Sequence, residues 1–125
     1  MLKLINVTLL TSYCSLIFFL SSRSSLPTPM LFEHQDKIHH LGAYFIMGIL
    51  GWRFFNDYFE KPAMLFVISL SFCSLYGASD EVHQYYVAGR EADIFDWLAD
   101  TLGASLALIT IQLSKKKFST KRKAS

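Results

Sequence analysis

Long stretches without charge constrain the fold of this chain more than any other feature. Residues 4–20 contain no charged side chain, and residues 62–79 contain none either. A helix from a soluble four-helix bundle carries a charged face that repeats every 3.6 residues, and neither stretch has such a face. A chain of 125 residues is too short to bury several helices that are apolar on all sides. The pattern therefore favours membrane-spanning helices over a soluble bundle.

The apolar residues, which make up 52% of the chain, gather in four blocks, at residues 4–20, 38–55, 62–79 and 97–113. A bilayer core about 30 Å thick needs roughly 17 to 25 helical residues, so each block can just span it. We predict an all-α fold, a four-transmembrane-helix bundle, with helices at about 4–20, 38–55, 62–84 and 94–113. Residues 1–114 would form one membrane domain. A cleaved signal peptide is the alternative for the first block, but no AxA-like cleavage site follows it.

The last eleven residues carry a cluster of positive charge. This basic tail, residues 115–125, contains Lys115, Lys116, Lys117, Lys121, Arg122 and Lys123. By the positive-inside rule the tail is cytoplasmic, and with four spans the N-terminus is cytoplasmic too. We therefore expect a multi-pass membrane protein with both chain ends in the cytoplasm. A nucleic-acid-binding arm is the competing interpretation, but topology and contact with anionic lipid explain such a tail better, and we expect no nucleic-acid partner.

The two cysteines, Cys14 and Cys73, each lie within an apolar block. We expect free thiols that pack as small apolar side chains, and not a disulfide.

Polar side chains concentrate between residues 77 and 103, which read GASDEVHQYYVAGREADIFDWLADTLG and hold six of the ten acidic residues. At the end of the third predicted helix, Asp80 lies three residues from His83 and four from Gln84, so these side chains share a helix face. Glu81 and His83 are candidates for general acid and base catalysis, because histidine exchanges protons near neutral pH. The alternative is a hydrated helix end whose polar groups bond to one another.

Asp93, Asp96 and Asp100 follow at spacings of three and four, which places three carboxylates along one helical stripe. Carboxylate oxygens suit Mg²⁺, so a magnesium site stays open, although no cofactor is required. The alternative is structural. Asp93 is a good N-cap and Asp96 is favoured by the helix dipole, whereas Asp100 within a span has no such explanation.

Arg90 follows Gly89 in the turn between the last two predicted helices. Its guanidinium could hold a phosphate or carboxylate group through two parallel hydrogen bonds, or it could pair with the acids around it.

The start of the second predicted helix lies on the same membrane side and carries Asp36, Lys37, His39 and His40. We expect this end to converge with the acidic segment, with Asp36 as a helix cap, Lys37 beside Asp80 or Glu81, and a histidine beside His83. A zinc site made of histidines is not favoured, because they lack close spacing. The binding candidates are Asp36, Lys37, His39, Gln84, Arg90, Asp93 and Asp96.

Two motifs in this region resemble the VanZ-like family of small multi-pass bacterial membrane proteins. They are DKIHHLGAYFIMGILG and YGASDEVHQYYVAGREADIFDWLADTLGA, and together they cover about residues 36–107. The matching signature positions are Asp36, Lys37, His39, Glu81, Gln84, Gly89, Arg90, Asp93, Asp96 and Gly103. The chain has Ala88 where a proline is frequent in the family. It also has Asp100 where an asparagine is frequent, which weakens the hypothesis of a three-carboxylate metal stripe.

The resemblance implies a role in the cell envelope, since the family takes its name from a member associated with resistance to the glycopeptide teicoplanin. Two functions stay open. The first is an envelope protein, with or without enzymatic activity, that acts on an anionic or phosphorylated lipid or a cell-wall precursor. The second is a non-catalytic scaffold or binding protein whose polar motif is an ion-pair network. Proton or ion transport is less favoured, because Asp100 is the only acid within a predicted span.

Overall fold

The computed structural model describes residues 1–25 and 29–124, and the described part is all helical. It contains α1 (Leu2–Ser21), α2 (Gln35–Phe55), α3 (Pro62–Tyr85) and α4 (Ile94–Ala124), with no strand among the described residues. The predicted all-α class is therefore confirmed, with one helix at each predicted block. The predicted first connection includes residues 26–28, and the basic tail includes residue 125; these lie outside the described residues.

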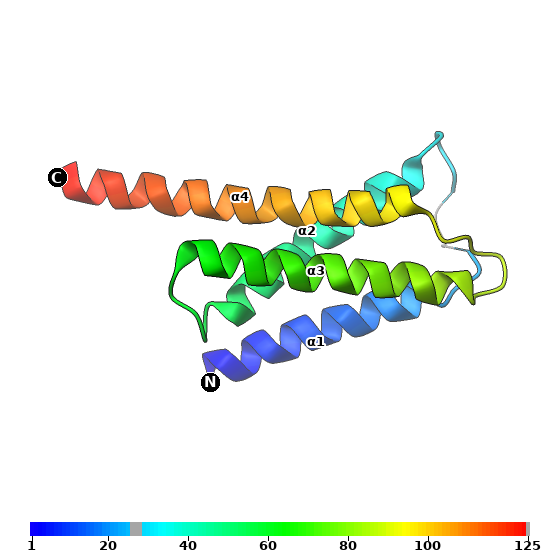
Figure 1. Ribbon diagram of the computed structural model, residues 1–125, viewed down its shortest axis with the longest axis horizontal. Coiled ribbons are helices and arrows are strands. Elements are labelled where there is room, and N and C mark those ends of the chain that lie inside the picture. The colour runs from blue at the N-terminus through cyan, green and yellow to red at the C-terminus, as the bar shows by residue number, and fades with distance from the viewer. Residues whose placement is uncertain (26–28, 125) are drawn as a thin grey trace.

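The helices alternate in direction, so both chain ends lie at one end of the bundle (Figure 1). The connections between α1 and α2 and between α3 and α4 meet at the opposite end. Helix α2 contacts each of the other three helices, and its contact with α4 is the most extensive. Helices α1 and α4 do not touch. Helix α2 is therefore the centre of the packing.

Three helices are long and apolar enough to cross a membrane: Leu2–Ser21, Pro62–Tyr85 and Ile94–Lys117. Their outward faces are apolar, with Phe18 on α1, Val67 and Leu75 on α3 and Ile109 on α4 among the exposed side chains. Exposed apolar side chains of this extent are typical of a surface that contacts lipid. Helix α2 is not among these three candidate spans, because its first turns and its end carry polar and charged residues.

Two predictions about helix ends are wrong. Helix α4 continues through the basic segment to Ala124 instead of stopping near residue 113. Residues 114–124 contain neither glycine nor proline, and lysine and arginine favour helix, so nothing in the sequence ends the helix earlier. Asp36 lies in the first turn of α2 and is not its cap. His34 is the N-cap, with φ of 62° and no side-chain capping bond.

Close backbone contact joins α2 to α4. A Cβ atom added at Gly48 would lie 3.0 Å from the carbonyl oxygen of Ala104, and one added at Gly103 would collide with the backbone of Leu41. Small residues permit such approaches between membrane helices, where dispersion contacts replace the hydrophobic effect. The core beside this contact includes Tyr44 and Met47. Cys14 and Cys73 are free thiols, as predicted.

We predict that Gly103→Ala lowers the thermal midpoint of the protein in detergent, since overpacking of this kind costs about 1–3 kcal/mol. The measurement is thermal unfolding followed by circular dichroism. Gly42→Ala is the matched control, because a Cβ at Gly42 would meet nothing within 4 Å. That control should keep or raise the midpoint, because alanine in place of glycine inside a helix adds up to about 1 kcal/mol to the free energy of unfolding. Equal midpoints for the two variants would contradict a tight contact between α2 and α4.

Candidate functional site

The predicted polar residues gather at the end of the bundle opposite the chain ends, where α2 and α4 begin and α1 and α3 end (Figure 1). Buried carboxylates line this end on α3 and α4: Asp80 and Glu81 on α3, Asp96 and Asp100 on α4. Buried carboxylates need partners, because desolvation of an unpaired charge is costly. Helix α2 supplies the partners of Asp96 and Asp100, whereas those of Asp80 and Glu81 come from α1, α3 and the connection before α4.

Lys37 on α2 bridges the start of α4. Its Nζ donates to Asp93 Oδ2 at 2.8 Å, to Asp96 Oδ1 at 3.0 Å and to Asp36 Oδ2 at 3.1 Å. Asp93 caps α4, as predicted, because its Oδ1 accepts from the backbone N–H of Phe95 at 2.8 Å. The hydrogen bond to Asp93 raises the pKa of Lys37, and the same bond lowers the pKa of Asp93. Both groups therefore stay charged across the physiological range.

His40 lies one turn further along α2 and contacts two carboxylates. Its Nδ1 is 2.8 Å from Asp100 Oδ1, and its Nε2 is 3.7 Å from Asp96 Oδ2. Asp100 is fully buried, with no exposed surface. A Cβ at Gly77 would lie 2.9 Å from Asp100 Oδ2, so the absence of a side chain on α3 makes room for this carboxylate.

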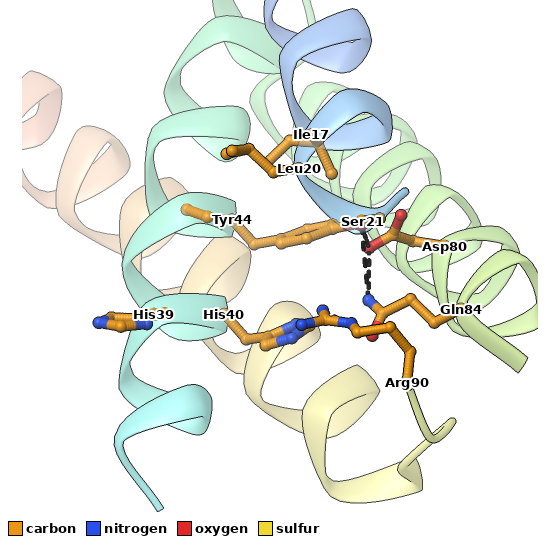
Figure 2. A pocket seen from close by; sticks show the side chains of 10 residues that line it. Ile17, Leu20, Ser21, His39, His40, Tyr44, Asp80, Gln84 and Arg90 are labelled. Atoms are coloured by element: carbon orange, nitrogen blue, oxygen red, sulfur yellow. Dashed lines mark hydrogen bonds between the residues drawn. The ribbon is translucent and has the colours of Figure 1, made fainter. Parts of the chain in front are cut away.

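A third group joins α1, α3 and the connection before α4 (Figure 2). Asp80 Oδ2 accepts from Ser21 Oγ at 2.8 Å and from Gln84 Nε2 at 3.2 Å. Gln84 Oε1 in turn accepts from Arg90 Nη2 at 2.8 Å. No carboxylate of the described residues lies within ion-pair distance of Arg90. Asp80 and Gln84 share a helix face as their spacing predicts.

Two cavities meet at Arg90, His40 and Gln84. The first, of about 90 Å³, is mainly apolar and is lined by Ile17, Leu20, Ser21, His39, His40, Ala43, Tyr44, Asp80, Gln84 and Arg90. Figure 2 shows the Arg90 side chain reaching from the connection before α4 toward His40. The second cavity, of about 360 Å³, is polar and is lined by Ser24, Asp36, His40, Gln84, Gly89, Arg90, Glu91, Asp93 and Asp96. Gly89 has φ of 81°, which a glycine adopts readily, and it turns the chain so that Arg90 faces both cavities.

The expected pairing of Lys37 with Asp80 or Glu81 is wrong, because Lys37 bonds to Asp36, Asp93 and Asp96. Helix α2 lies closest to α4, so the lysine reaches the start of α4 instead of the end of α3.

The structure also separates Glu81 from His83. Glu81 is buried, and its Oε2 accepts from the backbone N–H of Asp93 at 2.8 Å. His83 faces α1, where its ring stacks on Phe18 at 4.5 Å and its Nε2 lies 2.9 Å from Ser22 Oγ. Residues two apart on a helix point in different directions, so no acid–base pair forms between them. The expectation that a histidine of α2 joins His83 is also wrong, since His40 contacts Asp96 and Asp100.

The predicted aspartate stripe is formed, but cationic or polar side chains already contact each member. Lys37 forms ion pairs with Asp93 and Asp96, and His40 contacts Asp100. Each carboxylate of the stripe therefore already has a nitrogen-bearing partner on α2.

Of the seven binding candidates, all except Lys37 line one of the cavities. Sequence reasoning placed His40 at this end of the bundle but not among the binding candidates, and it did not single out Ser21 or Tyr44. His40 had a usable signal, because it is three residues from Lys37 and four from Asp36 and so shares their helix face. Ser21 had none, since it comes from α1, far away in the sequence.

The contact between Lys37 and Asp93 gives a pH prediction. A carboxyl group whose pKa is lowered by folding stabilises the fold above its unfolded pKa of about 3.9, and this contribution is lost as the pH falls through the lowered value. Asp93→Asn should therefore lower the thermal midpoint at pH 7. The loss in free energy of unfolding should be at most about 1 kcal/mol, because the pair is partly exposed. The difference from the unmodified protein should begin to shrink below about pH 4 and should vanish once the pH lies below the lowered pKa of Asp93. Glu91→Gln, at an exposed acid of the same connection, should behave like the unmodified protein throughout.

The comparison with known proteins agrees with the geometry. The family model described as VanZ/LLP1 matches residues 3–115, which extends the similarity beyond the two motifs into α1 and along α4. No curated protein and no solved structure gives a significant match. With nearly the whole chain matched and membrane-spanning helices on either side of the polar residues, this membrane protein belongs to the VanZ/LLP1 family.

Proposed function

We propose that the protein binds the anionic headgroup of a membrane lipid or of a lipid-linked cell-wall precursor at the polar end of the bundle. The observation that carries this proposal is the state of Arg90. Its guanidinium makes one hydrogen bond, to the neutral Gln84, has no carboxylate partner among the described residues, and lines both cavities. Arginine presents donors in a fixed fork that matches phosphate and carboxylate oxygens, so the remaining donors suit such a group.

The two cavities support an amphiphilic ligand. The smaller one is bounded by Ile17, Leu20, Ala43 and the ring of Tyr44, whereas the larger one is bounded mainly by polar side chains. A ligand with an apolar chain next to a charged group matches this division, because each part meets surface of its own kind. Ile17 and Leu20 belong to α1, a candidate membrane span, so the apolar cavity lies close to where lipid chains would be.

In this proposal all four helices cross the inner membrane of a bacterium, with both chain ends in the cytoplasm. The basic residues at the end of α4 support this orientation through the positive-inside rule. Helix α2 would cross with its polar first turns inside the bundle, since His40 contacts Asp100 of α4 and Lys37 bonds to Asp93 and Asp96 at the start of α4. The binding site then opens on the outer side, where envelope precursors are used. Glycopeptide resistance, including resistance to teicoplanin, would be one consequence of such a role.

The alternative, a scaffold held by a structural ion-pair network, fits only part of the site. Lys37 with Asp93 and Asp96 is such a network, and we assign it to holding α2 against α4. Arg90 is different because it has no ion pair with any residue that the structure describes. Binding is also better supported than acid–base catalysis, since Glu81 and His83 face different helices.

The test is lipid binding by the purified protein in detergent, measured by native mass spectrometry with phosphatidylglycerol and with a long-chain prenyl phosphate. Arg90→Ala should weaken binding of the anionic lipid by about tenfold or more, the loss expected for a charge-assisted hydrogen bond of about 1.5–3 kcal/mol. Arg90→Lys should recover only part of it, because an ammonium group lacks the planar fork. Phosphatidylcholine should show a smaller difference between these proteins.

Arg23→Ala is the matched control. Arg23 lies at the same end of the bundle, packs over the ring of Phe19 and lines neither cavity, so its loss should leave lipid binding unchanged. Equal weakening by both substitutions would mean that net charge, and not the site, attracts the lipid. In cells, lipid and precursor profiles of a deletion strain should return to normal with the unmodified gene and with Arg23→Ala, but not with Arg90→Ala.

A further inference from the structure

We propose that His40, Glu81 and Asp100 bind a divalent metal cation between α2, α3 and α4. Each residue offers one ligand atom, and these atoms all lie within 4.8 Å of one another. Two ligands on opposite sides of an ion are about 4.2 Å apart when each bond is about 2.1 Å long. A small adjustment of the side chains would therefore bring all three onto one ion.

Two buried oxygen atoms in this group lack partners. Glu81 Oε1 and Asp100 Oδ2 have no hydrogen-bond partner among the described residues, and their side chains belong to residues that are 7% and 0% exposed. A buried acceptor without a partner costs about 1–3 kcal/mol, and more when it carries charge. Two such atoms at one place indicate a missing positive group.

The other atoms of the same side chains are held in place. Glu81 Oε2 accepts from the backbone N–H of Asp93 at 2.8 Å, and Asp100 Oδ1 lies 2.8 Å from His40 Nδ1. A metal ion can take the place of the proton between His40 Nδ1 and Asp100, because neighbouring ligands of one ion lie about 3 Å apart. His40 Nε2 then carries the proton, and it lies 3.7 Å from Asp96 Oδ2. Metal-binding histidines commonly have such a carboxylate beside the second ring nitrogen, which fixes the tautomer.

The charge balance of this end also favours a cation. Among the described residues, two lysine or arginine side chains contact the carboxylates of this end or line its two cavities: Lys37 bonds to carboxylates and Arg90 lines both cavities. The carboxylates at this end outnumber them. The carboxylates are Asp36, Asp80, Glu81, Glu91, Asp93, Asp96 and Asp100. Like charges that share a buried site destabilise one another unless a proton or a cation neutralises them. Lys37 bonds to Asp36, Asp93 and Asp96, so neither Glu81 nor Asp100 is among its partners.

One imidazole nitrogen and two carboxylate oxygens suit Zn²⁺ or Mn²⁺ better than Mg²⁺ or Ca²⁺, which prefer oxygen ligands alone. Three protein ligands leave at least one coordination position open. His40 also lines both cavities, so the metal-binding group borders the space beside Arg90. An ion bound there would balance part of the negative charge of these carboxylates and could contact the same anionic headgroup. This last point rests on the proposed function, whereas metal binding itself does not.

The experiment is calorimetric titration of the full-length protein in detergent with Zn²⁺ and Mn²⁺ after treatment with a chelator. The unmodified protein should bind one ion per chain. Glu81→Gln and Asp100→Asn should each weaken binding by at least about tenfold, since loss of even an outer partner of a metal ligand costs that much. Glu91→Gln should bind normally, because Glu91 is exposed and outside the group. Arg90→Ala should also bind the metal normally, even though it fails to bind the lipid.

Thermal unfolding keeps the proposal testable if a variant is poorly stable. In chelator, Glu81→Gln should unfold at the same temperature as the unmodified protein or higher, because it removes an unpaired buried carboxylate. Adding Zn²⁺ should reverse this order by stabilising only the unmodified protein. Two results would overturn the proposal: no binding at millimolar metal, which would mean that a shared proton neutralises the pair, or equal binding by all variants, which would indicate surface sites.

Discussion

The close contact between α2 and α4 is the constraint on which the rest of the molecule depends. Gly48 and Gly103 remove side chains where the two backbones meet, and Ala104 and Ala107 keep the facing surface of α4 small. At this separation Lys37 reaches Asp93 and Asp96. Without the contact, the carboxylates of α4 would face either lipid or other acids, and both are costly. Packing between small residues and neutralisation of charge therefore stabilise the same pair of helices.

Polar groups in this protein are tolerated because the bundle encloses them. Asp100 is fully buried inside a helix whose outer face is apolar, and Gly77 on α3 provides the space that it occupies. The same principle operates at the opposite end, where the buried Asn6 donates to Asp57 Oδ2 at 2.8 Å and Arg53 Nε donates to Asn6 Oδ1 at 3.3 Å. A membrane helix can hold such side chains only when another helix supplies the partners. The need for partners of buried polar groups therefore limits which helix faces can pack against each other.

The polar end divides into parts with different roles. Lys37 and its three carboxylates hold helices together, and each charge there has a partner. In the part of the chain that the structure describes, Arg90 keeps donors without an acceptor, and Glu81 Oε1 and Asp100 Oδ2 keep lone pairs without a donor. Unsatisfied polar groups are rare in folded proteins, and several at one end of a bundle indicate a site that binds a charged ligand. The ion pairs of Lys37 are therefore assigned to holding the bundle together, whereas Arg90, Glu81 and Asp100 are the residues to which we assign binding.

The sequence by itself determined the helices, their number and the end of the bundle at which the polar residues gather. It did so because a charge-free run of span length admits few structures, and because Asp93 caps a helix through its own local bond. Residue types also predicted free cysteines and a shared face for Asp80 and Gln84. Partners across helices could not be predicted. Spacing along one helix says which side chains share a face, but not which neighbouring helix that face meets.

Only the tertiary structure decided that α2 lies against α4, and therefore that Lys37 bonds to Asp93 and Asp96 instead of Asp80 or Glu81. It also turned His83 toward α1 and brought His40 to Asp100. The physical reason is that these pairings follow from how closely two backbones approach. That distance depends on glycine and alanine residues on both helices together, so neither helix reveals it alone.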